Sequence, residues 1–186
     1  MYRYDLVTPN TDPIVTLQEV KSHCDIDADN TDRDTDIQAY IDAVRDFWEK
    51  QTDRSMLATT WRLYLDEFPY EIELCRCPVQ SVTSVKYYSS AGVLTTLDPS
   101  DYQVSLTEPA RVCPQWGSAF PIADYRLESV VIEFVAGYSA IPASIKIGMK
   151  HLVKHFYEHP AACISGTIIA EVPWTFRNML NNSRWH

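Results

Sequence analysis

The chain has 186 residues, with 16 Lys and Arg against 25 Asp and Glu, so its formal net charge is −9. A composition with 46% hydrophobic and 12% aromatic residues indicates one folded domain or two small ones and excludes a disordered chain. The excess of acid argues against general binding of nucleic acid, which needs clustered Lys and Arg. The sequence contains neither a membrane-spanning apolar run nor a signal-peptide pattern, so we expect no membrane contact and no export.

Helical periodicity begins early in the chain. Residues 1–13 contain two prolines and show no periodicity, which predicts an arm. Thr16 and Glu19 have the spacing of a capping box, which predicts that a short helix begins there and ends near residue 24. Apolar residues at helical spacing then predict a longer helix over about 34–53, after an acidic loop.

The hydrophobic period changes from 3.6 to 2 at about residue 59. β-branched and alternating segments, separated by turns, predict a small antiparallel β-domain of about six strands over 59–138, with an irregular stretch at 107–127. Helical spacing returns after Pro142 and continues to about His159. We therefore expect an α+β fold in which N- and C-terminal helices form a helical bundle and the antiparallel β-domain is inserted between them.

This expectation divides the chain into four parts. They are an N-terminal arm (1–13), a helical bundle (14–58 plus 140–159), an antiparallel β-domain (59–138) and a C-terminal extension (160–186).

More than half of the net charge lies in one loop. Residues 25–36 carry a net charge of −5, because they hold one Arg and six Asp: Asp25, Asp27, Asp29, Asp32, Asp34 and Asp36. The first three follow the spacing of an EF-hand, but Asn30 takes the place of the required Gly and Arg33 brings a cation into the proposed shell. We prefer a solvated loop that caps the next helix, and a calcium-dependent binding module is the alternative.

A second alternative uses histidine. His151, His155 and His159 share one face of the last predicted helix, where two imidazoles could hold a metal ion. The H-E-x-x-H order is absent and the third ligand is unassigned, so we interpret the three residues as the polar flank of an amphipathic helix and predict no metal site.

Catalytic motifs are absent from the sequence. Five cysteines cannot all pair, and Cys75 and Cys77 stand too close together for a zinc knuckle, so free thiols are expected. Neither G-x-S-x-G nor a phosphate-binding glycine loop occurs. We predict no enzymatic activity and no cofactor, with a hydrolase site in the cleft of 107–127 as a minor alternative.

The end of the chain has the composition of an interface. Residues 172–186 combine aromatic, aliphatic and Arg side chains with no acid, and such residues commonly anchor contacts between proteins. A helix folded onto the chain's own core is the alternative. The residues expected to bind a partner are Trp174, Phe176, Arg177, Leu180, Arg184 and Trp185.

The order of short segments is also informative. They are 14–21, the Asp-rich loop, 36–45, 59–63, 77–87, 97–102, 135–138, 141–146 and 156–158. In this order, over roughly residues 14–182, the chain resembles the head–tail connector (adaptor, or head-completion) proteins of long-tailed bacteriophages and gene transfer agents.

The resemblance implies a structural virion protein at the capsid–tail junction, assembled in the cytoplasm of the host bacterium. Such adaptors form a homo-oligomeric ring, usually of twelve copies, beneath the portal protein, and they join it to a stopper or tail-completion protein. The C-terminal residues named above would bind the portal. DNA would only pass through, without sequence-specific binding, and the six Asp of the acidic loop are candidates for the channel wall because acid repels phosphate.

Overall fold

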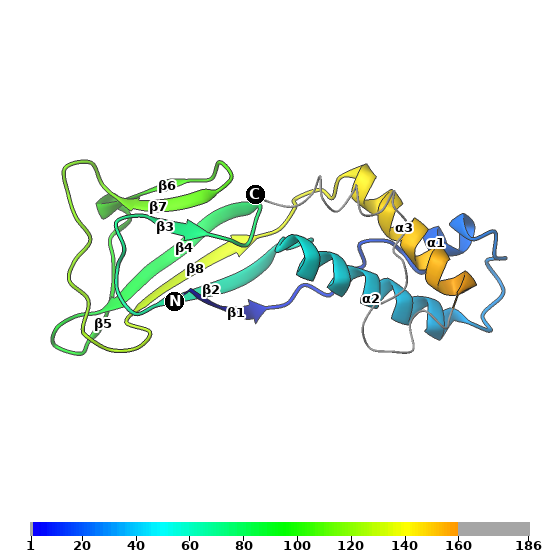
Figure 1. Ribbon diagram of the computed structural model, residues 1–186, viewed down its shortest axis with the longest axis horizontal. Coiled ribbons are helices and arrows are strands. Elements are labelled where there is room, and N and C mark those ends of the chain that lie inside the picture. Colours follow the sequence, from blue (N-terminus) through cyan, green and yellow to red (C-terminus); the bar gives the residue numbers. More distant parts are fainter. Residues whose placement is uncertain (1, 160–186) are drawn as a thin grey trace. The chain divides into compact units, whose positions relative to one another are not determined.

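Residues 2–159 are described in a computed structural model (Figure 1). Their contacts divide the chain into two compact units, each built from two separate stretches. The first unit contains the residues up to Thr11 together with Leu57–Ser139, and it holds the strands. The second contains Asp12–Met56 together with the residues from Ala140 onward, and it holds the α-helices.

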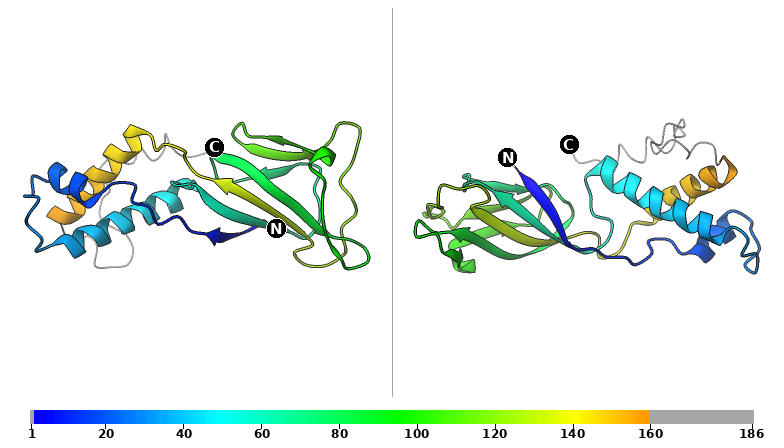
Figure 2. Two further views of the ribbon diagram at one scale, coloured as in Figure 1. Left: turned by 180° about the vertical axis from the view of Figure 1, so that it is seen from behind. Right: turned by 90° about the horizontal axis from the view of Figure 1, so that it is seen from below.

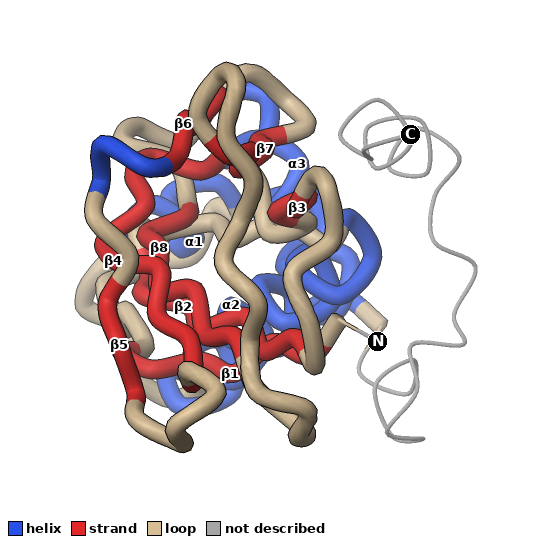
Figure 3. The backbone as a smooth tube through the Cα atoms, turned by 90° about the vertical axis from the view of Figure 1, so that its left-hand side faces the viewer, coloured by secondary structure: helices blue, strands red, loops and turns tan. Residues whose placement is uncertain are grey.

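The first unit contains two antiparallel sheets (Figures 1 and 3). The larger sheet has five strands in the spatial order β1 (Arg3–Thr8), β2 (Thr59–Leu65), β8 (Val130–Ala136), β4 (Val79–Tyr88) and β5 (Leu94–Thr96). The smaller sheet has the order β3 (Ile72–Leu74), β7 (Ala110–Pro114) and β6 (Tyr102–Ser105), and a short 3-10 helix, Pro99–Asp101, precedes β6.

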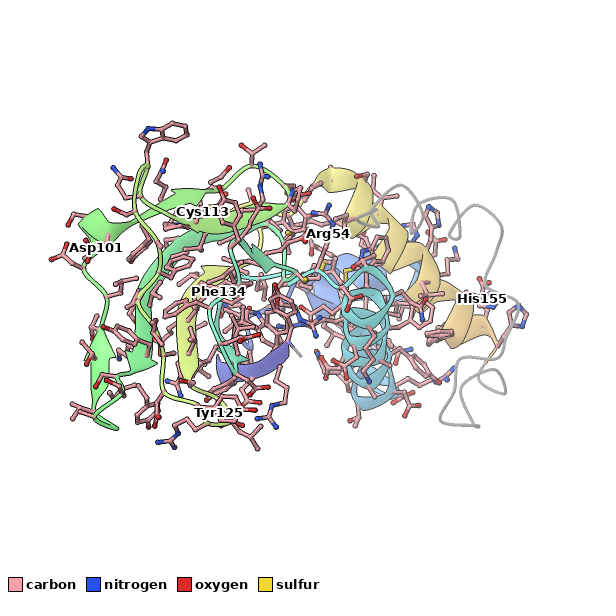
Figure 4. The ribbon with its side chains drawn as sticks, turned by 60° about the vertical axis from the view of Figure 1, so that its left-hand side comes forward. Arg54, Asp101, Cys113, Tyr125, Phe134 and His155 are labelled. Carbon is pink, nitrogen blue, oxygen red and sulfur yellow. The ribbon has the colours of Figure 1, made fainter. Side chains whose placement is uncertain are left out.

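Strand β8 organises the core of this unit. Its side chains alternate between buried and partly buried positions, as expected for a strand that covers one apolar face. It pairs with β2 on one side and β4 on the other, so that Phe134 lies opposite both Trp61 and Val82 (Figure 4 labels Phe134). Apolar residues from both sheets join one buried cluster, which includes Ile72 of the smaller sheet.

The first strand is fastened by one tyrosine. The Tyr4 ring meets Phe134 edge to face, with 6.3 Å between ring centroids. Its hydroxyl accepts a hydrogen bond from the Cys75 backbone nitrogen at 3.1 Å and donates to the Glu73 carbonyl at 3.4 Å. Burial raises the pKa of Tyr4, so the hydroxyl stays protonated and able to donate. Figure 2 shows β1, in dark blue, at the edge of the larger sheet.

The helical unit contains α1 (Leu17–His23), α2 (Asp34–Thr52) and α3 (Ala143–Glu158), which contact one another. The predicted capping box begins α1: the Glu19 nitrogen donates to Thr16 Oγ1, and the Thr16 nitrogen donates to Glu19 Oε2. The longer helices bury one apolar stripe each, with Trp48 of α2 and Phe156 of α3 fully covered. No helix in residues 2–159 has the length and apolar character to span a bilayer.

The expected fold class is wrong. The described chain is mostly β, with eight strands in two antiparallel sheets and three α-helices, rather than an N- and C-terminal helical bundle with an inserted β-domain. Residues 3–8 form β1 and pair with β2, so sheet formation starts ahead of the first helix. Residues 110–114, inside the stretch expected to be irregular, form β7. The four-part division of the chain stays a prediction.

A glycine fixes the approach of two segments in the β unit. Gly137 has φ +131°, and a Cβ at this position would lie 2.0 Å from the Leu57 carbonyl oxygen. Gly92 also has a positive φ, +72°, but has open space around it. Placing Ala at each position therefore compares the cost of a positive φ alone, at Gly92, with the cost of a positive φ plus a steric clash, at Gly137.

We expect Gly137→Ala to lower the free energy of unfolding by about 3 kcal/mol or more, because strain adds to a backbone clash. Gly92→Ala, the matched control, should cost about 1 kcal/mol, since only the positive φ opposes it. Urea denaturation followed by circular dichroism measures both values. Equal losses in the two variants would contradict the close approach at Leu57.

Candidate functional site

A buried ammonium group organises the acidic loop between α1 and α2. The Lys21 side chain projects from α1, and the residue is only 2% exposed. Its Nζ donates to the Asn30 carbonyl at 2.8 Å and to the Ala28 carbonyl at 3.2 Å, and it forms an ion pair with Asp34. A buried cation is tolerated only when it is paired and hydrogen-bonded, and this loop supplies both kinds of partner.

This arrangement provides no support for calcium binding. A calcium ion would need six or more oxygen ligands directed inward, whereas the inward carbonyls and Asp34 face Lys21. Asp27 Oδ1 instead accepts from the Asp29 nitrogen at 3.3 Å, in a local turn. Among residues 2–159, no group of three or more His, Cys, Asp or Glu side chains is placed to hold a metal ion.

The remaining acids of the loop face solvent. Five of the six candidate aspartates are exposed, and Asp34 is the one turned inward. Asp25 lies 3.9 Å from Lys154 of α3, and Arg33 lies 3.5 Å from Asp36 while its guanidinium covers the Tyr157 ring at 4.4 Å. The loop is therefore held against α3 by one weak charge contact and one cation–π contact, and it keeps a strongly negative outer surface.

The face of α3 that carries His151, His155 and His159 contacts a fourth histidine, His23 of α1, which the sequence did not suggest. The rings of His151 and His23 meet edge to face with centroids 4.8 Å apart, and His155 and His159 are 5.0 Å apart. Burial, together with the nearby His151 and Lys154, lowers the pKa of His23. Figure 4 shows His155 projecting from α3. The contact of His23 with His151 packs α1 against α3, and the histidines form no three-ligand site in the described chain.

The β unit carries an open apolar groove of about 1060 Å³. It lies between residues 66–70 and the loop 114–127, and its stacked Phe68 and Phe120 rings have centroids 4.6 Å apart. Ile122 is 89% exposed and Tyr125 is fully exposed beside it. This is the cleft considered for a hydrolase, and its lining residues include no His, Cys or Lys that could act as a base beside Ser118. The groove has the character of a contact surface.

The proposed partner-binding residues Trp174, Phe176, Arg177, Leu180, Arg184 and Trp185 lie outside the described residues. The acidic loop and the groove, in contrast, can be examined in detail. The sequence pointed to the loop through its Asp content. For the groove, the sequence suggested only a cleft in the irregular stretch 107–127, and it did not indicate the contribution of residues 66–70.

Comparison with known proteins identifies the family resemblance independently. Residues 14–92 match the family model of the phage gp6-like head-tail connector proteins. This segment includes α1, the acidic loop, α2 and the strands through β4. No curated protein matches the chain.

Solved structures share the fold over nearly the whole length. A chain of the neck of an empty gene transfer agent particle, computed with C6 symmetry, is 19% identical with a TM-score of 0.78, covering 99% of this chain and 96% of that one. A chain of the virion of a native gene transfer agent particle is 21% identical with a TM-score of 0.79, covering 98% and 95%. A chain of the native neck computed with C12 symmetry is 20% identical with a TM-score of 0.69, covering 98% and 96%.

Together these findings show what the chain resembles: chains of gene transfer agent particles in its fold, and a head-tail connector in the sequence of one segment. The resemblance drawn from the sequence is thereby confirmed, through the match of residues 14–92 to the head-tail connector family model. The family match and the shared fold support a structural connector role at the head–tail junction of a virion.

We expect Lys21→Met to lower the free energy of unfolding by about 3 kcal/mol, because it leaves Asp34 and two carbonyl groups without their buried cation. Lys154→Met is the matched control, since its contact with Asp25 is largely exposed and should be worth less than about 1 kcal/mol. Chemical denaturation measures both. A loss at Lys21 no larger than that at Lys154 would show that the ammonium does not organise the loop.

Proposed function

We propose that this protein is a subunit of a head–tail connector ring that docks on the portal vertex, joins the capsid to the tail or stopper, and lets DNA pass. The observation that carries the proposal is the match of residues 14–92 to the gp6-like connector family. The fold shared with neck chains of gene transfer agents supports it over the rest of the described chain.

The ring would contain twelve copies. Two of the similar chains come from necks computed with C6 and C12 symmetry. A cyclic ring joins two different faces of neighbouring subunits, so each copy needs two unlike contact surfaces. The exposed apolar groove of the β unit is a candidate for one of them.

The C-terminal segment would make the portal contact. Residues 174–186 contain two Trp, one Phe and two Arg and no acid, a composition suited to anchoring in apolar pockets of a partner. The β unit would then contact the next neck component, a stopper or tail-completion protein. The complete particle would place the ring at the capsid–tail junction, with assembly in the cytoplasm of the host bacterium.

The acidic loop would line the DNA channel. The net charge of residues 25–36 is −5. Lys21 pairs with Asp34 on the inner side of the loop, and the other five carboxylates are exposed to solvent. Repeated around a ring, these charges would repel the phosphate backbone and keep DNA from adhering as it passes. DNA would have no sequence-specific contact, and the protein would need neither a cofactor nor a membrane.

We expect a chain ending at residue 173 to fold normally and to lose portal binding, because the aromatic and Arg anchors are removed. The test mixes the chain with purified portal rings and examines the complexes by negative-stain electron microscopy. The full-length protein should add a twelve-fold ring, and the shortened chain should not.

The double variant Trp174→Ala/Trp185→Ala tests the same contact without a deletion, and Val93→Ala in the β unit is a control at an exposed position. Circular dichroism separates binding from folding. Unfolding of the shortened chain would favour a C-terminal helix docked on its own core, and undiminished portal binding would reject the assigned anchors.

We expect Asp27→Asn/Asp29→Asn/Asp32→Asn to increase retention of DNA by assembled portal–connector complexes several-fold at low salt, with the difference shrinking as salt is added. Asn keeps the side-chain oxygen that Asp27 uses in its turn, so the loop should keep its shape. Filter retention of labelled duplex DNA measures the effect. Exposed Asp101 of the β unit, changed to Asn, is the control, and unchanged retention in the triple variant would place the loop away from the channel.

A further inference from the structure

The groove of the β unit is built to receive an apolar chain segment. Phe68 stacks on Phe120 and also meets Tyr87 at 5.7 Å between centroids, so the aromatic floor is braced from the sheet. The prolines at 69, 114 and 121 stiffen its walls. Large apolar side chains this exposed are unusual outside binding surfaces when they gather at one place.

The large exposed side chains belong to one neighbourhood. Tyr70, Ile122, Tyr125 and Leu127 all line the groove, and each is at least 75% exposed. Figure 4 shows Tyr125 on the long loop of the β unit, projecting away from the core position of Phe134. Their exposure costs solvation free energy that a bound segment would recover.

The residues that line the groove carry more negative than positive charge, which favours a positively charged occupant. Asp66, Glu67 and Asp124 line the groove, and among residues 2–159 the only lining cation is Arg126. The Arg126 guanidinium already covers the Tyr88 ring, 3.9 Å from its centroid. An occupant should therefore combine aromatic or aliphatic anchors with positive charge.

We infer that this groove binds the C-terminal segment, residues 172–186, of a second copy of the chain. That segment offers two Trp, Phe, Met and Leu as anchors and two Arg for the acidic rim, and it has no acid of its own. A tail from one copy in the groove of the next joins two unlike surfaces, which is the head-to-tail geometry that a ring requires.

The inference goes beyond the proposed portal contact. The same Trp and Phe side chains cannot fill the groove and a portal pocket together, so the two sites compete for the tail. Groove binding does not depend on the portal contact being correct, and it can be measured on the purified protein alone.

The experiment uses three full-length proteins in sedimentation velocity, from about 1 to about 100 µM, a range that covers ordinary micromolar affinity. A groove variant, Ile122→Asp/Tyr125→Asp, changes exposed positions and should fold normally. A tail variant, Trp174→Ala/Phe176→Ala, keeps the groove intact. The wild type should self-associate with rising concentration, and each variant alone should do so at least tenfold more weakly.

Mixing the two variants is the decisive step. The groove variant still carries a good tail and the tail variant a good groove, so the mixture should form one-to-one heterodimers and nothing larger. Val93→Asp, an exposed change in the same unit but outside the groove, should associate like the wild type.

A wild type that stays monomeric over the whole range overturns the inference, as does association that the groove variant leaves unchanged or a mixture that forms no heterodimer. Portal binding by the groove variant, measured on the same preparations, should persist. If the groove variant lost both portal binding and self-association, the groove would instead belong to the portal contact. Failure of the inference and failure of the proposed function therefore give different results.

Discussion

The helical unit depends on one ammonium group. Lys21 joins the end of α1 to two carbonyls of the acidic loop and to Asp34, the first residue of α2. Without that cation, six aspartates within twelve residues would repel one another just where the chain must turn between two helices. The other five aspartates lie at the surface, and one of them, Asp27, also supports the turn by accepting a hydrogen bond from the Asp29 nitrogen. The loop is therefore acidic on its outer surface and is held by the Lys21 ammonium on its inner side.

The sequence predicted local structure well, but it did not predict structure that depends on contacts between residues far apart in the chain. The capping box of Thr16 and Glu19 begins α1 as expected, because all of its signals lie within four residues. Strand β1 was missed because its partner β2 lies more than fifty residues away and no turn joins them. Because β1 and β7 also belong to the sheets, the described chain is mostly β, and the expected helical bundle with a β insertion is wrong.

The same limit applies to the candidate surfaces. The acidic loop could be read from composition, but the role of Lys21 could not, since backbone carbonyls accept hydrogen bonds whatever the residue. The contact of His23 with His151 joins two helices that are separated by most of the chain. A cleft in the stretch 107–127 was expected, but the exposure of its apolar residues was not, because Pro and apolar residues in an irregular stretch can be either buried or exposed and only the fold decides which.

Both units are closed by segments made late during synthesis. The central strand β8 ends at residue 136 and α3 begins at residue 143, so neither core can be completed until most of the polypeptide has left the ribosome. Folding must then proceed through long-range closure instead of growing outward from the first helices. A nascent chain that stops before α3 would lack one face of the helical unit, so folding of that unit depends on translation at least through residue 158.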